Sequence, residues 1–222
     1  MFKKLFISGA FLVPFLFSAQ EETLKSESRI SIIPAVGYAW RLAKMPSGIP
    51  KDTRDYIKGL KTGLNIDVSA YYHFKGSGAI GIKYSNYMAS SDGRLTVQGL
   101  NGEAVSGFVS TKDNISFVGP AYMFSNFKDD TKHKLFYDIA LGVITYTTKT
   151  GSVKGTGSNL GLEANFAYQY AITNQIFIGP KLGVTAGTLS KMKYNGTTVN
   201  FGEDEGEGLS RLSLSAAVTF RF

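Results

Sequence analysis

Residues 211–222, RLSLSAAVTFRF, alternate between apolar and polar side chains without a break. Side chains in a strand point alternately to its two faces, so this stretch predicts a β-strand with one apolar face and one polar face. The apolar face carries Leu212, Leu214, Ala216, Val218, Phe220 and Phe222, and the polar face carries Arg211, Ser213, Ser215, Ala217, Thr219 and Arg221. The stretch therefore predicts an all-β fold in which two environments lie on opposite sides of a sheet.

The same alternation recurs along the chain and predicts seven more strands. In the second of them, the run from Leu60 to Phe74 places Leu, Ile, Val, Ala, Tyr and Phe on one face and Lys, Asn, Asp, Ser and His on the other. The high content of Tyr, Phe and Gly fits a β-rich protein, because aromatic residues favour strands and glycines favour turns. The predicted strands cover residues 30–42, 58–74, 78–91, 112–126, 133–148, 158–172, 175–190 and 208–222.

Connections of two lengths alternate between these strands. Short turns are predicted at 75–77, 127–132 and 173–174, and longer loops at 43–57, 92–111, 149–157 and 191–207. Outer-membrane barrels combine short periplasmic turns with long external loops. Eight strands with both ends on the periplasmic side need three short turns and four long loops. The pattern therefore predicts an eight-stranded antiparallel up-and-down transmembrane β-barrel.

The start of the chain predicts export. Lys3 and Lys4 precede an apolar run over residues 5–17, the arrangement of a secretory signal peptide. We predict a signal peptide over 1–20 with cleavage after 19 or 20, a periplasmic tail over 21–29 and the barrel over 30–222. No later run reaches 18 consecutive apolar residues, so no transmembrane helix is expected. The absence of cysteine excludes disulfides, lipoprotein attachment and cysteine-based zinc sites.

Three prolines stand against regular strands. Pro34, Pro120 and Pro180 fall inside predicted strands, where each removes a hydrogen-bond donor from the ladder. A closed barrel has no edge strand to accommodate them. Because β-bulges tolerate both glycine and proline, we expect bulges at Gly119-Pro120 and Gly179-Pro180.

The final strand, with its closing aromatic residue, resembles the C-terminal signature of bacterial outer-membrane β-barrels. In that family the barrel-assembly machinery reads the terminal aromatic, which implies an assembly signal at Phe220 and Phe222. The chain as a whole is similar in architecture to small barrels of the OmpA/OmpX/opacity-protein type. The resemblance implies a location in the outer membrane of a Gram-negative cell. A soluble barrel of the lipocalin type is the alternative, with the two faces exchanged.

The polar faces favour the membrane barrel over the soluble barrel. They combine small residues with charged ones, which suits a narrow interior filled by side chains. Opposite charges there are expected to pair, because an unpaired ion in a dry interior is costly. The predicted interior charge network contains Arg41, Lys61, Asp67, Lys83, Asp138, Glu163, Lys181 and Arg211. A plug that closes the pore is one role for it, and a proton or ion path is the other.

Catalytic, metal and cofactor sites are not predicted. His73 and His133 are the two histidines, and both lie beside predicted short turns, far from the outer leaflet where lipid A-modifying enzymes act. The acidic stretch 203–207 offers oxygen ligands but lacks the spacing of a calcium loop. We therefore expect no enzyme activity and no cofactor, with lipid A modification left open. A structural or surface-interaction role through the loops leads, and a small transport or secretion-accessory barrel is the alternative.

Net charge narrows the expected partners. The formal charge of +7 could attract nucleic acid or anionic lipid head groups. For an exported chain we expect lipopolysaccharide phosphates instead of nucleic acid, although dispersed solubilising charge explains the excess equally well. The expected partners are outer-membrane lipid and lipopolysaccharide, the barrel-assembly machinery, and surface proteins or host ligands at the loops.

Overall fold

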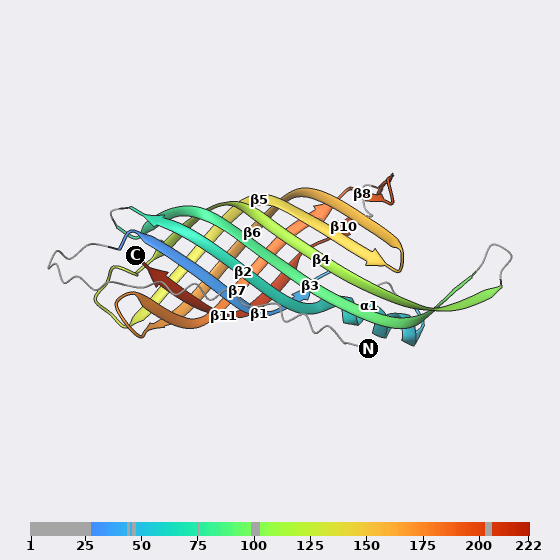
Figure 1. The fold of residues 1–222 in the computed structure, drawn as a ribbon, viewed down its shortest axis with the longest axis horizontal. Coiled ribbons are helices and arrows are strands. Elements are labelled where there is room, and N and C mark those ends of the chain that lie inside the picture. Colours follow the sequence, from blue (N-terminus) through green and yellow to red (C-terminus); the bar gives the residue numbers. More distant parts are fainter. Residues whose placement is uncertain (1–27, 44, 46–47, 75, 99–102, 203–205) are drawn as a thin grey trace, which may run out of the picture.

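Eight strands close into an antiparallel barrel in the computed structural model, as the sequence predicts (Figure 1). The structure describes residues 28–43, 45, 48–74, 76–98, 103–202 and 206–222. The predicted signal peptide 1–20 and most of the predicted tail 21–29 lie outside the described residues. The barrel strands are β1 (Ile30–Arg41), β2 (Thr62–His73), β3 (Gly78–Gln98), β4 (Ala104–Ser125), β5 (His133–Thr150), β6 (Val153–Ala171), β7 (Ile176–Leu189) and β11 (Arg211–Arg221).

The last strand closes the barrel. Each strand from β1 to β6 pairs with the next, and β11 pairs with both β7 and β1. The seam continues to the last residue, because Ile30 N donates to Phe222 O at 3.1 Å and Phe222 N donates to Ile30 O at 2.9 Å. Closure leaves the spanning part of the sheet without an open edge, which a bilayer requires.

Short turns and longer extensions lie at opposite ends of the barrel, and the three predicted short turns are confirmed. Two of the predicted long loops are wrong. Most of 92–111 belongs to β3 and β4, which form a ribbon that projects beyond the barrel (Figure 1), and 149–157 contains only a tight turn at Gly151 and Ser152. The last of the four predicted long loops, 191–207, contains the short strands β8 (Lys191–Tyr194) and β9 (Thr197–Asn200) and the start of β10 (Glu207–Gly208).

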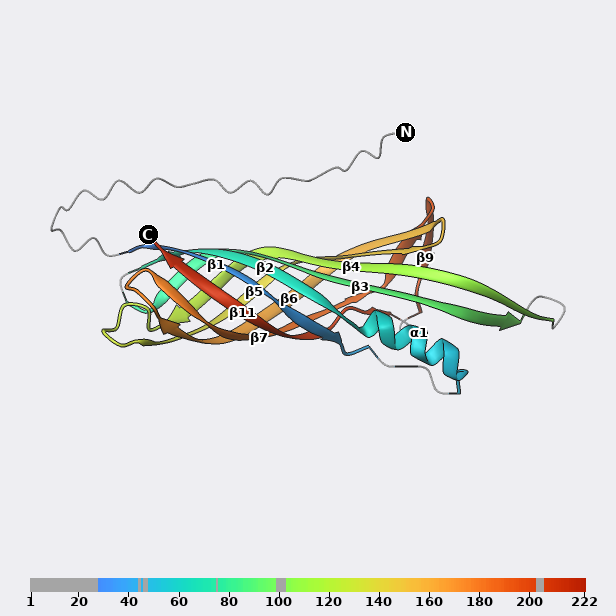
Figure 2. The same ribbon diagram turned by 60° about the horizontal axis from the view of Figure 1, so that its bottom comes forward.

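A helix, α1 (Lys51–Lys61), replaces the start of the second predicted strand and much of the loop before it. Pro50 precedes the helix, Asp52 lies in its first turn, and Lys58 and Lys61 lie in its last turn, where each charge complements the helix dipole. Its buried Tyr56 packs against Gly93 of the ribbon. Figure 2 shows α1 beside the ribbon. The prediction of a strand from residue 58 is wrong because a tertiary contact favours the helix.

The prolines interrupt the ladder but do not shift its register. Around Pro34, Pro120 and Pro180 the pairing with one neighbouring strand lacks two bridges, and the register is the same on both sides of each gap. A bulge adds a residue to one strand and would shift that register. The predicted bulges at Gly119-Pro120 and Gly179-Pro180 are therefore wrong. All three rings lie on the outer face, where the missing donor costs one ladder bond.

The outer face is apolar and the inner face is polar, the reverse of a soluble barrel. On β11, Leu212, Leu214 and Phe220 are exposed, whereas the arginines and serines of the other face are buried. Large apolar side chains are exposed on every barrel strand. Exposed aromatic residues gather near the short turns, as in an interfacial girdle: Tyr72, Phe74, Tyr122, Phe124, Tyr137, Tyr168, Tyr170, Phe220 and Phe222. This distribution fits a barrel that faces lipid.

Candidate functional site: the filled interior and the external extensions

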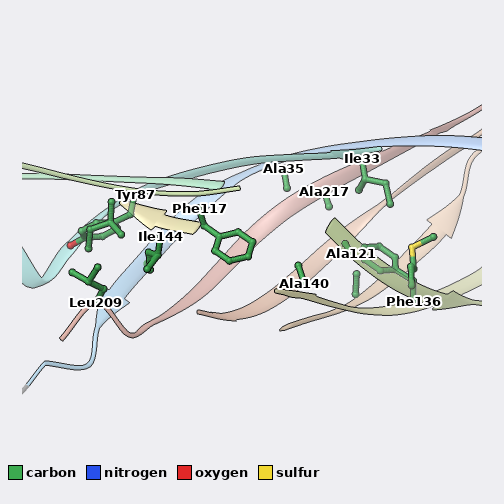
Figure 3. Packing of buried hydrophobic residues seen from close by; sticks show 14 of the residues in the cluster. Ile33, Ala35, Tyr87, Phe117, Ala121, Phe136, Ala140, Ile144, Leu209 and Ala217 are labelled. Atoms are coloured by element: carbon green, nitrogen blue, oxygen red, sulfur yellow. The ribbon is translucent and has the colours of Figure 1, made fainter. Parts of the chain in front are cut away.

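Buried apolar side chains occupy both ends of the barrel interior. Figure 3 shows Tyr87, Ile144 and Leu209 together toward one end and Ile33, Ala121 and Phe136 toward the other. Near the middle, the apolar lining includes the small residues Ala35, Ala140 and Ala217, together with Phe117. Small residues at this level leave space for long charged side chains from the same strands.

A charge network fills that middle layer. Lys83 Nζ lies 2.9 Å from Asp138 Oδ1 and 3.6 Å from Glu163 Oε1. Arg211 Nη2 lies 3.7 Å from Glu163 Oε2 and donates to Ser85 Oγ at 2.8 Å. Neutral groups complete the layer, since Ser85 and Thr185 donate to Glu163 and Asn165 donates to Asp138. The network joins five strands, so it connects opposite walls of the barrel.

The other predicted interior charges are distributed over two further places. Lys181 pairs with Asp67, and both side chains are nearly inaccessible to solvent. Arg41 lies at the external end, where it pairs with Asp113 at 3.3 Å and Glu207 at 2.6 Å. Lys61 is the exception, because it ends α1 and its Nζ donates to the Ala43 carbonyl at 2.6 Å. The alternation within strands predicts which side chains point inward. It does not apply to Lys61, because the observed strand β2 begins at Thr62 and Lys61 ends α1 instead.

An aromatic plug at the turn end is absent from our predictions. Phe127 lies in the connection between β4 and β5, and its side chain is 2% exposed. It packs against Phe136 and Phe177, with ring centroids 5.7 and 5.2 Å away. Arg221 donates to the Phe127 carbonyl at 2.8 Å, and Lys134 lies over the Phe177 ring. An apolar residue beside an Asp-rich turn is the one sequence signal for this plug.

The two histidines lie in different environments. His133 is exposed at the turn end, and its Nδ1 is 2.7 Å from the Tyr168 hydroxyl. His73 faces the interior, with Nε2 2.7 Å from Ser31 Oγ. Both Ser31 and His73 are nearly inaccessible, at 0% and 2% exposure. Among the described residues, no carboxylate forms a hydrogen bond or ion pair with His73, so the third member of a hydrolase triad is missing there.

Metal-ligand clusters and membrane-spanning helices do not occur in the described part of the chain. Within it, His, Asp and Glu form no group of three or more able to hold a metal ion. Among the same residues, no helix is both long and apolar enough to cross a membrane. Most of the acidic stretch 203–207 lies outside the described residues.

The external extensions project beyond the barrel (Figure 1). Beyond the pairing of Leu64 with Met88, β3 continues to Gln98, a further distance of about 30 Å along the strand. The ribbon carries Phe108, which is 76% exposed. α1 packs on the face of this ribbon that continues the barrel interior, where Tyr56 contacts Gly93 of β3 and donates to Thr111 of β4. On the β4 side, Gly151 N donates to Ser110 O at 3.2 Å, and no described strand pairs with residues 104–110 there.

Comparisons with known proteins place the fold. No protein-family model matches the chain, and no curated protein matches it either. Neisserial surface protein A is similar in structure, with 14% sequence identity, a TM-score of 0.53, and coverage of 87% of this chain and 97% of that one. A major outer membrane protein from Thermus thermophilus gives 11% identity, a TM-score of 0.52, and coverage of 88% and 100%. Together with the exposed apolar face and the closed ladder, these likenesses show that the chain has the fold of the small eight-stranded outer-membrane β-barrels.

Proposed function

We propose that this protein is a non-enzymatic integral outer-membrane barrel whose role is surface interaction through its external extensions. The observation that carries the proposal is the contrast between a packed interior and an external ribbon whose β4 edge has no described strand partner. Lys83, Lys181 and Arg211 are each no more than 1% exposed in the middle of the barrel. An eight-stranded barrel has an interior just wide enough for its own side chains, so the packing supports a scaffold more than a channel.

The ribbon supplies the surface for such a role. Backbone groups of alternate residues point to the same edge of a strand, and Ser110 O already points toward β5. Ser106 and Phe108 therefore present their N–H and C=O groups past the end of β5, where no described strand receives them. Unpaired strand edges accept extended segments of other proteins. The ribbon thus offers backbone hydrogen bonds and the exposed Phe108 ring to a surface protein or host ligand.

Attachment of cells tests the surface role. We compare cells that produce the wild-type barrel with cells that produce a variant whose ribbon residues 92–109 are replaced by a two-residue turn, on monolayers of cultured epithelial cells. Phe108→Ser is the milder variant, and Thr197→Ser on β9 is the matched control. We expect several-fold lower attachment for the shortened ribbon, intermediate attachment for Phe108→Ser and no change for the control. Equal attachment by all four strains contradicts the proposal, provided that each barrel shifts in gel mobility on boiling.

Planar-bilayer recording tests the closed interior separately. We expect no discrete conductance steps from the wild-type barrel in concentrated salt. Discrete steps would favour the transport alternative over a scaffold.

Unchanged lipid A mass spectra after gene deletion are expected as well, and a change in lipid A acylation would overturn the non-enzymatic part of the proposal.

A further inference from the structure

A row of lysines crosses three adjacent barrel strands on the outer wall. Lys112 of β4 is the direct cross-strand partner of Lys149 of β5, and Lys149 is the direct partner of Lys154 of β6. All three side chains are exposed. Lys193 of β8 lies on the same face, because it pairs with Thr156 of β6, two residues along the strand from Lys154. Like charges directly opposite one another destabilise a sheet, so this row needs a counter-charge.

The described part of the protein supplies little counter-charge to this row. No described carboxylate forms an ion pair with Lys112, Lys149, Lys154 or Lys193. Asp92 lies on the same face, but its cross-strand partner is Ser110, so it is only a diagonal neighbour of Lys112. Asp113 and Glu163 are buried on the inner face. The row therefore presents its positive charge sideways, toward whatever surrounds the barrel.

The rows below the lysines follow a regular order of chemistry. The last apolar row is Val118, Val143 and Leu160, which are direct partners across the same three strands. Two rows of neutral hydrogen-bonding residues follow toward the external end: first Ser116, Thr145 and Ser158, then Asn114, Thr147 and Thr156. The lysine row comes next. Along one wall, the barrel thus presents an apolar layer, then hydroxyls and an amide, then positive charge.

The height of the lysines identifies the layer that they face. Six residues separate Val143 from Lys149, which is about 20 Å along the strand and about 15 Å along the axis of a barrel with a strand tilt of about 40°. The head-group region of a phospholipid leaflet is about 5–8 Å thick. Measured from the last apolar row, Lys149 therefore lies farther out than the phosphates of an ordinary phospholipid. An amphiphile that matches this wall needs acyl chains, then sugar hydroxyls, then phosphates at greater height.

We propose that the outer wall of β4, β5, β6 and β8 is a binding surface for a phosphorylated glycolipid of the outer leaflet. Its acyl chains would lie on Val118, Val143 and Leu160, and its sugars on the two neutral rows. Its phosphates would lie between the lysines and relieve their mutual repulsion. The opposite wall lacks this order, since Trp40 and Leu212 lie at the external ends of β1 and β11. This inference does not depend on the role proposed for the ribbon.

Titration of purified barrels with lipopolysaccharide tests the surface. Barrels in non-ionic micelles are titrated with rough lipopolysaccharide that carries its lipid A and core phosphates, and binding is followed by thermophoresis. The test variant is Lys112→Gln/Lys149→Gln/Lys154→Gln. The matched control, Lys51→Gln/Arg54→Gln/Lys58→Gln, removes the same charge from exposed positions on α1. Each lysine near an anionic surface contributes about a fivefold change in affinity, so we expect about a hundredfold weakening for the test variant.

Three further results decide the outcome. The control should weaken binding only slightly, the triple Lys→Arg variant should retain it, and enzymatically dephosphorylated lipopolysaccharide should bind far less. Equal weakening in test and control variants would reduce the effect to net charge and overturn the proposal. Equal binding of the dephosphorylated glycolipid would also overturn it. So would tighter binding of a soluble heparin oligosaccharide than of the lipopolysaccharide. A mobility shift on boiling establishes that each variant is folded.

Discussion

Replacing Glu163 with Gln tests whether the interior network holds the barrel together. Glu163 lies 3.6 Å from Lys83 and 3.7 Å from Arg211, and it accepts hydrogen bonds from Ser85 at 2.6 Å and Thr185 at 3.2 Å. At an effective dielectric constant of about 20, each ionic contact is worth about 4 kcal/mol. The change also removes a buried carboxylate and its desolvation cost of several kcal/mol. We expect a net loss of about 3–5 kcal/mol in the free energy of unfolding, the range for a broken buried pair.

Urea unfolding of the barrel in phosphatidylcholine vesicles measures this loss. Trp40, the one tryptophan of the sequence, lies on the outer face and reports on insertion through its fluorescence. Asp92→Asn is the control, since Asp92 is exposed outside the barrel, and it should change the free energy of unfolding by less than about 0.5 kcal/mol. If Glu163→Gln also stays within that limit, the network does not stabilise the barrel and the reasoning fails.

A double variant separates lost charge balance from lost packing. Glu163→Gln leaves the partners Lys83 and Arg211 with one carboxylate fewer, whereas Glu163→Gln/Arg211→Met removes one charge of each sign. We expect the double variant to be more stable than the single variant, with a coupling free energy of about 1–3 kcal/mol. Strictly additive losses would show that Glu163 acts through packing and not through charge.

Three further predictions concern Phe222 at the barrel seam, Gly119 on β4 and Tyr56 of α1. Phe222→Ala should lower the yield of heat-modifiable barrel several-fold in outer-membrane fractions, whereas Phe222→Tyr should not; equal yields would exclude the predicted role of this ring in assembly. Gly119→Ala places a Cβ 2.4 Å from the Leu141 carbonyl oxygen and should cost about 1–3 kcal/mol in urea unfolding, whereas Gly107→Ala meets nothing within 4 Å and should be neutral. Tyr56→Ala should speed hydrogen exchange in α1 while the barrel strands stay protected, because Tyr56 buries its ring on the ribbon and donates its hydroxyl to Thr111; unchanged exchange in α1 would show that this contact does not hold the helix.

Period-two alternation explains why the barrel could be predicted from the sequence. In strands such as β2 and β11, every second side chain enters one environment, so the identity of the inward residues follows from one choice of face. That choice places Asp67, Lys83, Asp138 and Glu163 inside, and the structure buries all four. The pattern does not give the stagger between strands. The partners of each charge, such as Asp67 for Lys181, therefore could not be derived from it.

The external ribbon and the lysine row could not be predicted from the sequence for a related reason. Residues 92–98 (DGRLTVQ) and 104–111 (AVSGFVST) mix Gly, Ser and Thr with Leu, Val and Phe, a composition shared by loops and by exposed strands, so the local pattern does not separate the two. The local pattern does not show the long ladder between β3 and β4, which pairs residues from Gly78–Phe124 to Gln98–Ala104 and forms the ribbon, nor the packing of Tyr56 on Gly93. The lysine row has the same origin. Lys112, Lys149 and Lys154 are ordinary surface lysines in the sequence, and only the register between β4, β5 and β6 brings them side by side. In this barrel, the alternation within strands therefore separates lipid from interior, whereas the register between strands creates the surfaces that other molecules can recognise.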